Sequence, residues 1–397
     1  MPALLLMTAF AFAGFAVMLP VAPMHMMAAG GGTFLAGLVN AVLMGATILT
    51  QVVVERARTV LGWRLSLALG CALLGAPALL EIAATTPWQI IVLAAVRGIG
   101  FGIVTVSGSS AIATLFTPER RGRAIGAYGL AVAGAQLVLT PIAPWIAETG
   151  GFPIALAVAG LPLLGIPFAI AAGAAIERHA RRAAPAAAPT VDADGRGETT
   201  LHALRRLGLP ILALTVVTCA GGAITTFAPQ FVPGTTLTVI ALFVYTAAAA
   251  FTRWLAGGFA DRHGAKRFVL PGLVLAMVGL AAFAAAIAGI TGPVAPIVFI
   301  LGAILVGSSF GTMQNVTLVR AFELAGEHAR GVASTAWNVA FDAGTGIGAL
   351  AIGALAAGSS FTFSFVVLAA LCAVAAVVLV IGERDGAERP HSERRSA

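Results

Sequence analysis

The chain has 397 residues, of which 59% are hydrophobic and only 10% are charged, and its mean hydropathy is +0.99. A soluble domain of this length cannot hide so much apolar surface from water, so the composition excludes a soluble globular protein and predicts one that spans a lipid bilayer. The formal net charge of +7 would by itself also suit a nucleic-acid-binding protein, so the placement of the basic residues has to decide.

Twelve apolar segments follow one another along the chain, and each is long enough to cross the hydrocarbon core as a helix. The first has no basic segment before it and no polar chain after a cleavage site, so we interpret it as a membrane span and not as a signal peptide. The predicted spans are residues 3–24, 33–54, 61–83, 88–115, 124–147, 153–176, 207–230, 235–258, 267–290, 293–319, 331–357 and 359–381.

Two segments interrupt or follow these spans. Residues 177–206 are rich in Arg, Ala and Pro, which predicts a partly disordered linker between an N-terminal half (1–176) and a C-terminal half (207–381). Residues 382–397 alternate charges and contain Pro390, and we expect a disordered tail there.

The basic residues gather in alternate connections. They occupy the even-numbered connections and the span ends beside them, the linker and the tail, and the odd-numbered connections carry none. Only Arg97 and Arg253 lie away from the ends of the predicted spans. By the positive-inside rule, the linker and both termini are predicted to be cytoplasmic. The basicity is therefore a signal of membrane topology and does not favour a nucleic-acid partner.

The eighth connection holds the most informative motif of the chain. Gly264 can adopt a turn conformation that a residue with a Cβ would resist, and the neighbouring glycines let two membrane helices approach closely. Asp261 is placed where it could cap a neighbouring helix N-terminus. The predicted cytoplasmic gate motif consists of Gly257, Gly258, Asp261, Arg262, Gly264, Lys266 and Arg267.

The string G-G-F-A-D-R-H-G-A-K-R resembles the loop signature of the major facilitator superfamily in its second-half copy. Residues 50–64 align with 252–266 at an offset of 202, and Gly98-x-x-Phe101-Gly102 aligns with Gly307-x-x-Phe310-Gly311 at an offset of 209. The resemblance implies an all-α integral membrane protein with twelve transmembrane helices in two pseudo-symmetric halves of six. The first-half motif is degenerate, with Glu55 in place of Gly257 and Thr59 in place of Asp261.

Arg97 and Asp342 are the candidate proton-coupling residues. An arginine well inside a span is costly and should face a cavity or a partner. The string Arg-Gly-Ile-Gly-Phe-Gly resembles the fourth-helix motif of the superfamily, whose arginine is associated with proton coupling in exporters. Asp342 is the only acid near the middle of a predicted span, and burial raises the pKa of a carboxyl, which suits a proton site. The alternatives are an arginine that crosslinks helices and a carboxyl that packs two of them.

Other polar residues within the spans form a candidate substrate cavity. Asn338 and Thr345 share the helix face of Asp342, and the remaining candidates are Gln136, Gln314 and Asn315. Each is equally explained as a hydrogen-bonding residue between packed helices. His25 and Glu81 are expected at the outer ends of the first and third spans, where they would meet interfacial water and headgroups.

The sequence thus predicts a secondary transporter that exports a small, fairly apolar compound in exchange for protons. We expect a monomer in a plasma membrane, with small molecules, protons and the bilayer as partners. An uptake symporter or uniporter on the same scaffold is the first alternative, and a non-transporting receptor or assembly partner is the second. We expect no enzyme activity, metal or cofactor, because the chain has one lysine, no phosphate loop, and three widely spaced cysteines in apolar segments.

Overall fold

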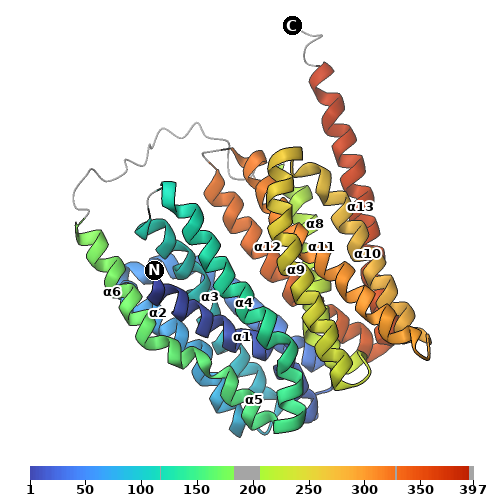
Figure 1. Ribbon diagram of the computed structural model, residues 1–397, viewed down its shortest axis with the longest axis horizontal. Coiled ribbons are helices and arrows are strands. Elements are labelled where there is room, and N and C mark those ends of the chain that lie inside the picture. Colours follow the sequence, from blue (N-terminus) through green and yellow to red (C-terminus); the bar gives the residue numbers. More distant parts are fainter. Residues whose placement is uncertain (117, 183–205, 327–328, 393–397) are drawn as a thin grey trace. The chain divides into compact units, whose positions relative to one another are not determined.

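The computed structural model describes residues 1–116, 118–182, 206–326 and 329–392, and every regular element within these ranges is a helix (Figure 1). The predicted all-α class is therefore confirmed. The helices are α1 (Pro2–Ala28), α2 (Gly32–Leu80), η1 (Glu81–Ala83), α3 (Pro87–Leu115), α4 (Pro118–Gly150), α5 (Phe152–Ala159), η2 (Leu161–Gly165), α6 (Ile166–Arg182), α8 (Gly208–Phe231), α9 (Thr235–His263), α10 (Lys266–Ala288), α11 (Val294–Ala325), α12 (Arg330–Gly358) and α13 (Phe361–Ser392).

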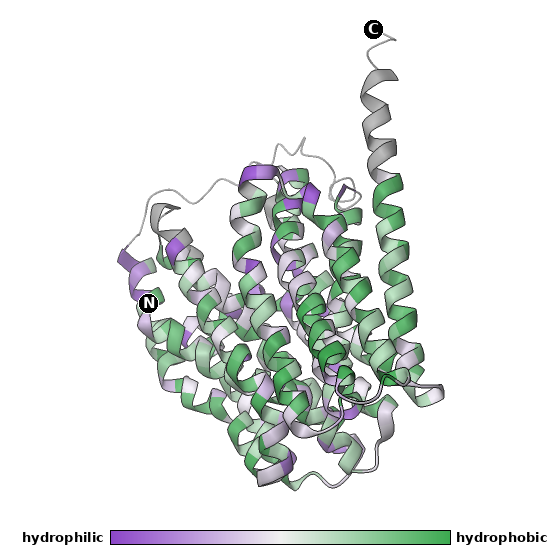
Figure 2. Cartoon of the chain, turned by 45° about the vertical axis from the view of Figure 1, so that its right-hand side comes forward, coloured by the Kyte–Doolittle hydropathy of each residue, from purple (hydrophilic) through white to green (hydrophobic). Residues whose placement is uncertain are grey.

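Membrane-spanning helices make up nearly all of the described chain. Within the described ranges, eleven helical segments are long and apolar enough to cross a bilayer. Figure 2 shows apolar colouring along most of their length, with the most hydrophilic segments at or near helix ends. The prediction of a multi-pass membrane protein is confirmed, and the difference between eleven segments and the twelve predicted spans lies in α2.

Helix α2 has 49 residues, and a straight helix of that length would measure about 73 Å, more than twice the thickness of the hydrocarbon core. It is not straight, because Gly62 has φ 77° and ψ 169°, a left-handed conformation that glycine adopts readily. The residues before this bend run parallel to α3: a Cβ on Gly98 would lie 2.2 Å from the carbonyl oxygen of Leu43, and one on Gly102 would lie 2.9 Å from that of Thr47.

The residues after the bend run the other way. A Cβ on Gly100 of α3 would lie 2.4 Å from the nitrogen of Leu74, whereas one on Gly70 would lie 3.0 Å from Val104. As the residue number rises in α3 it falls in this part of α2, so the two parts of α2 are antiparallel. Helix α2 therefore folds back at Gly62 and contains two crossings, which accounts for the difference between eleven and twelve.

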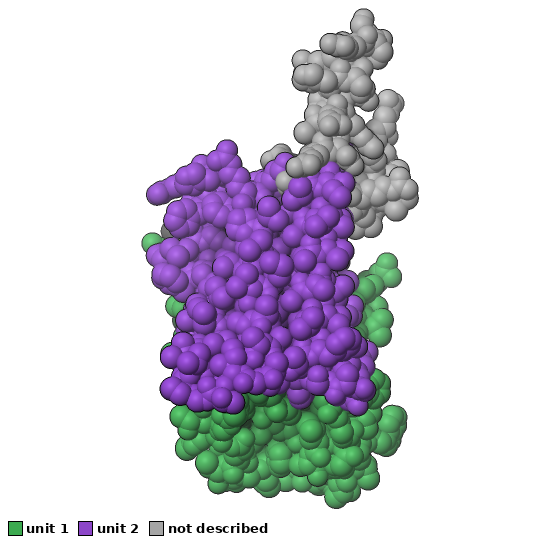
Figure 3. All heavy atoms as spheres, turned by 90° about the vertical axis from the view of Figure 1, so that its right-hand side faces the viewer, with its two compact units in different colours: residues 1–196, 225–243 green, residues 197–224, 244–397 purple. Residues whose placement is uncertain are grey.

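The chain forms two compact units (Figure 3). Unit 1 comprises the described residues of 1–196 and 225–243, and unit 2 comprises those of 197–224 and 244–397. The predicted linker begins within α6, which extends to Arg182, and residues 183–205 lie outside the described residues. The predicted tail also begins within a helix, since α13 continues to Ser392.

The internal repeat is visible in the helix contacts of each unit. In unit 1, a Cβ on Gly98 would lie 2.2 Å from the carbonyl oxygen of Leu43; in unit 2, one on Gly307 would lie 2.3 Å from that of Tyr245. Gly98 and Gly307 differ by 209 positions, and Leu43 and Tyr245 by 202, which are the two offsets found in the sequence. The repeated glycines therefore perform the same structural task, a close helix crossing, in both halves.

Candidate functional site

A buried ion pair lies inside unit 1. Arg97 on α3 is 1% exposed, and its Nη1 donates a hydrogen bond of 3.3 Å to Oε2 of Glu81, the first residue of η1, which is 0% exposed. An arginine side chain on a helix points back toward the helix N-terminus, which brings the guanidinium of Arg97 toward the end where α3 starts. The prediction that Arg97 should have a partner within the protein is confirmed.

A histidine completes this group. Nδ1 of His25, in the last turn of α1, lies 3.4 Å from Oε1 of Glu81, and the His25 ring lies 4.9 Å, centroid to centroid, from that of Phe152 on α5. Its side chain is 12% exposed, so it is the most accessible member. We call these three residues the Glu81 cluster. One carboxylate thus contacts a permanently charged guanidinium on one oxygen and a titratable imidazole on the other.

The expectation that Glu81 would reach the headgroups is wrong. The short 3-10 turn η1 packs against α2, α3 and α5, so the carboxylate faces into the unit instead of outward. A signal was present in the sequence: one acid and one buried arginine stand 16 positions apart, on the two sides of a short connection between consecutive antiparallel helices. Sequence reasoning missed it because the apolar stretch gave no sign that the helix ends in an inward turn.

The second copy of the repeat lacks this pair. Gly70 contacts Val104 on the following helix, and Gly272, which lies 202 positions later, contacts Met313 in the same way. The same offset of 202 aligns Glu81 with Phe283. At the offset of 209, Arg97 aligns with Val306.

Phe283 is 1% exposed and Val306 is 0% exposed, so unit 2 fills the equivalent positions with apolar side chains. The helix packing that the two halves share therefore does not require a charge at these positions.

Asp342 lies in unit 2, on α12, and is 6% exposed. Thr345, on the same face, is buried and donates a hydrogen bond of 2.9 Å to the carbonyl oxygen of Phe341, whereas Asn338 is exposed and bonds to Ser334 of its own helix at 2.8 Å. Asp342 and Arg97 belong to different units, and their joint role in proton coupling stays a prediction.

The polar residues predicted on α11 connect two helices of unit 2. Nη1 of Arg253, on α9, donates a hydrogen bond of 2.7 Å to Oε1 of Gln314, and Nδ2 of Asn315 lies 3.4 Å from the carbonyl oxygen of Arg253. These contacts match the alternative in which such residues join packed helices. Gln136, on α4 of unit 1, is partly buried.

The gate motif forms the turn between α9 and α10. Gly264 has φ 82°, which confirms that this position takes a conformation unfavourable for residues with a Cβ. A Cβ on Gly257 would lie 3.3 Å from Nδ2 of Asn315, while no described atom would lie within 4 Å of one on Gly258. Arg262, Lys266 and Arg267 are exposed. The side chain of Asp261 lies outside the described residues.

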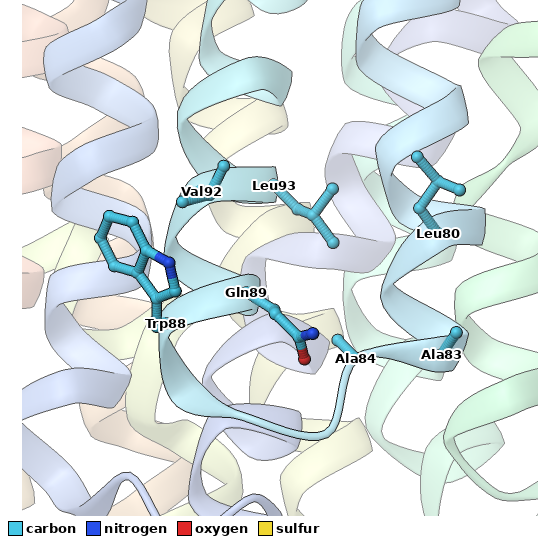
Figure 4. Close-up of a pocket in the computed structure, with 7 residues that line it drawn as sticks. All are labelled: Leu80, Ala83, Ala84, Trp88, Gln89, Val92 and Leu93. Carbon is cyan, nitrogen blue, oxygen red and sulfur yellow. The ribbon is translucent and has the colours of Figure 1, made fainter.

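Figure 4 shows a groove of about 310 Å³ beside the Glu81 cluster, between the end of α2 and the start of α3. Leu80 and Leu93 point into the space between the two helices, and Trp88 points away from it. Oε1 of Gln89 is already engaged, because it accepts hydrogen bonds from the backbone N–H groups of Thr85 and Thr86. The groove is therefore lined mainly by apolar side chains.

No metal site is found in the described ranges, where no three His, Cys, Asp or Glu residues come together in a way that could hold an ion. Cys71, Cys219 and Cys372 are buried, free thiols.

The membrane-spanning helices repeat in two copies, and the charged side chains of Arg97 and Glu81 are buried among the helices of the first copy. These features are typical of a multi-pass membrane protein of the transporter type. A family model for the Major Facilitator Superfamily matches residues 4–341 and, in a second match, 234–397. The chain belongs to this superfamily, and the suspected resemblance is confirmed. A comparison with curated proteins finds no match.

Solved structures support the same fold. The nucleoside transporter NupG is 13% identical, with a TM-score of 0.68, over 96% of this chain and 98% of that one. A bacterial homologue of the human lysosomal transporter Spinster, in an inward-facing and occupied conformation, is 16% identical, with a TM-score of 0.69, over 96% of each chain. At these identities the likeness shows the fold alone.

Proposed function

We propose that the chain is a secondary active transporter that exports a small, fairly apolar compound in exchange for protons. The observation that carries this proposal is the charge buried inside unit 1, where Arg97 is 1% exposed and paired with an equally buried carboxylate. Ionisable residues inside a membrane protein are costly and are found mainly where ions, protons or substrates pass. The membership in a transporter superfamily supports the same conclusion.

Asp342 is the proposed proton-binding residue of unit 2. A carboxyl alternates between a charged and a neutral form, which a proton carrier requires. Asp342 is a buried carboxyl, 6% exposed. In this proposal Arg97 keeps its positive charge throughout and attracts the carboxylates that it approaches. Asn338, Thr345, Gln136, Gln314 and Asn315 remain the proposed contacts of the substrate.

The competing proposal is an uptake symporter or uniporter on the same scaffold. It is favoured by the likeness to NupG, a nucleoside transporter, and nucleosides therefore belong among the compounds tested. A non-transporting receptor would need no buried titratable carboxylate, so the burial of Asp342 counts against that alternative.

The experiment is transport into everted membrane vesicles under an imposed pH gradient, with a panel of apolar compounds and nucleosides. Asp342→Asn should abolish accumulation against a concentration gradient and leave downhill exchange largely intact, because an amide cannot exchange the proton. Ile347→Ala, at an exposed position of the same helix that is not among the proposed substrate contacts, is the matched control for damage to α12. Uphill accumulation by Asp342→Asn would place the proton site elsewhere.

We also propose a plasma-membrane location, cytoplasmic termini and a monomeric state. The confinement of basic residues to alternate connections supports the orientation.

A further inference from the structure

We propose that Glu81 is a second proton-binding residue, in unit 1, and that His25 passes protons between water and Glu81. This assignment rests on the proposed proton-coupled function. It begins from the geometry of the Glu81 cluster, in which Oε2 of Glu81 lies 3.3 Å from Nη1 of Arg97 and Oε1 lies 3.4 Å from Nδ1 of His25.

The surroundings leave Glu81 no other charged partner among the described residues. Its turn packs against α2, α3 and α5. Helix α5 contains no titratable residue, and Arg97 is the only one on α3. On α2 the ionisable residues are Cys71 and, nearer the bend, Glu55, Arg56, Arg58 and Arg64.

On α1, His25 is the only titratable side chain. The protonation of Glu81 is therefore governed by two neighbours, the permanently charged guanidinium of Arg97 and the imidazole of His25, which can accept or donate a proton.

The gradient of exposure gives the cluster a direction. His25 is 12% exposed, and Glu81 and Arg97 are 0% and 1% exposed. His25 also lies in the last turn of α1, next to the loop formed by residues 29–31. A proton that enters from the water at this end of unit 1 reaches the imidazole before it reaches the carboxylate.

The proton transfer can be written with all charges balanced. A proton from water binds Nε2 of His25, and the proton on Nδ1 passes to Oε1 of Glu81. The imidazole returns to its neutral form, and Glu81 becomes a neutral carboxylic acid. Arg97 keeps its charge but loses the countercharge of its partner, so the proton and the guanidinium compete for the same carboxylate. Protonation of Glu81 thus frees Arg97 to interact with another acceptor.

The repeat indicates that this group serves chemistry and not packing. The aligned positions of unit 2 hold Phe283 and Val306, which are 1% and 0% exposed and carry no titratable group. The two halves thus share a helix crossing but not a charge.

The test is an infrared pH titration of the purified, reconstituted full-length chain, which reports the C=O stretching band of protonated carboxyl groups without any substrate. Glu81→Gln should lose a carboxyl titration that Asp342→Asn retains. Since removal of one charge from a buried pair can prevent folding, the charge-neutral double variant Glu81→Gln/Arg97→Gln should be measured as well and should lose the same band. Glu55→Gln is the matched control, because Glu55 also pairs with an arginine, Arg58, but is half exposed.

The relay has its own readout. After a pH jump, His25→Gln should retain the Glu81 band but slow its appearance by at least about tenfold, given that a positioned acid–base group contributes about 100-fold or more to proton transfer. His263→Gln, an exposed histidine at the end of α9, should change nothing. An unchanged rate in His25→Gln would overturn the relay.

The two proposals fail in different ways. If the carboxyl band assigned to Glu81 persists in Glu81→Gln and in the double variant, Glu81 is not a proton-binding residue, whatever the transport assays show. If the band is lost in these variants but transport by the wild type does not respond to any pH gradient, the proton site is supported and the proton-coupled function is overturned.

Discussion

An arginine at the centre of a membrane helix costs about 2.5–3.5 kcal/mol on insertion scales, and Arg97 reduces this cost by pairing with Glu81. Such a pair contributes little net stability, because the desolvation of both groups offsets their attraction. A protein in which hydrophobic residues of similar size replace such a pair is often as stable as the original or more stable. Unit 2 uses that solution at the aligned positions, with Phe283 and Val306. Stability alone therefore does not account for the charges of the Glu81 cluster, which is consistent with the proposed role in proton transfer.

The two ways of removing these charges should differ sharply. Arg97→Gln leaves Glu81 buried without its guanidinium partner and should lower the free energy of unfolding by about 3–5 kcal/mol. The double variant Glu81→Phe/Arg97→Val, which copies the second half of the chain, should be close to the wild type in stability and inactive in proton-driven transport. Equilibrium unfolding of both variants in mixed micelles provides the measurement. A double variant as unstable as Arg97→Gln would show that the pair is needed for folding.

At the scale of the helix, glycine sets how closely two elements approach. A Cβ on Gly311 of α11 would lie 2.0 Å from the carbonyl oxygen of Ala249 on α9, and the equivalent distance between Gly98 and Leu43 is 2.2 Å. Contacts this short involve backbone atoms, so a side chain at either position requires the helices to separate.

Gly98→Ala should therefore lower the free energy of unfolding by about 1–3 kcal/mol, the usual cost of overpacking. Gly126→Ala on α4 is the matched control: no described atom lies within 4 Å of its Cβ position, and alanine is favoured over glycine inside a helix by about 0.5–1 kcal/mol. Thermal unfolding of the two variants should move in opposite directions. A Gly98→Ala protein as stable as the wild type would mean that α2 and α3 can separate at no cost.

Most of the fold was predictable at this scale, and the site only in part. Apolar length and basic connections predicted the helices, and two offsets predicted the repeat that Gly98 and Gly307 display. A connection was expected at residues 55–60, but the bend lies at Gly62, just inside the predicted third span, and the sequence did not predict that α2 would stay helical up to it on both sides. The inward turn of η1 was missed, because hydropathy reports whether a segment is apolar and not which way its last side chain points.

The first-half copy of the gate motif also forms contacts that its sequence pattern did not predict. Its sequence lacks the acid at position 59, where Asp261 stands in the second copy, and pattern alone suggested the loss of an ionic contact at this end. The structure contains other polar contacts between helices at this end. Oε1 of Glu55 accepts a hydrogen bond of 2.7 Å from Ser110 on α3, and Nε of Arg64 lies 2.9 Å from Oε2 of Glu177 on α6. Partners so distant in the sequence are set by tertiary packing, which no local motif encodes.

At the scale of the whole molecule, alternating access requires two parts that move against each other, and the chain forms two compact units. Two termini on the same side of the membrane require an even number of crossings, and the double crossing of α2 is consistent with this. The orientation remains a prediction from charge. With twelve crossings and a basic linker in the cytoplasm, the loop between α8 and α9 must lie on the opposite side of the membrane.

Cysteine labelling tests this orientation directly. The three native cysteines are buried, so replacing them with alanine or serine gives a background without free thiols. A membrane-impermeant maleimide should then label Pro233→Cys, at an exposed position between α8 and α9, in intact cells. It should label Asp194→Cys, in the predicted linker, only after the membrane is permeabilised. Labelling of both sites from outside would contradict the twelve-crossing topology, and the reverse pattern would invert it. In the inverted case, His25 would meet the cytoplasm, and protons would enter the Glu81 cluster from inside the cell.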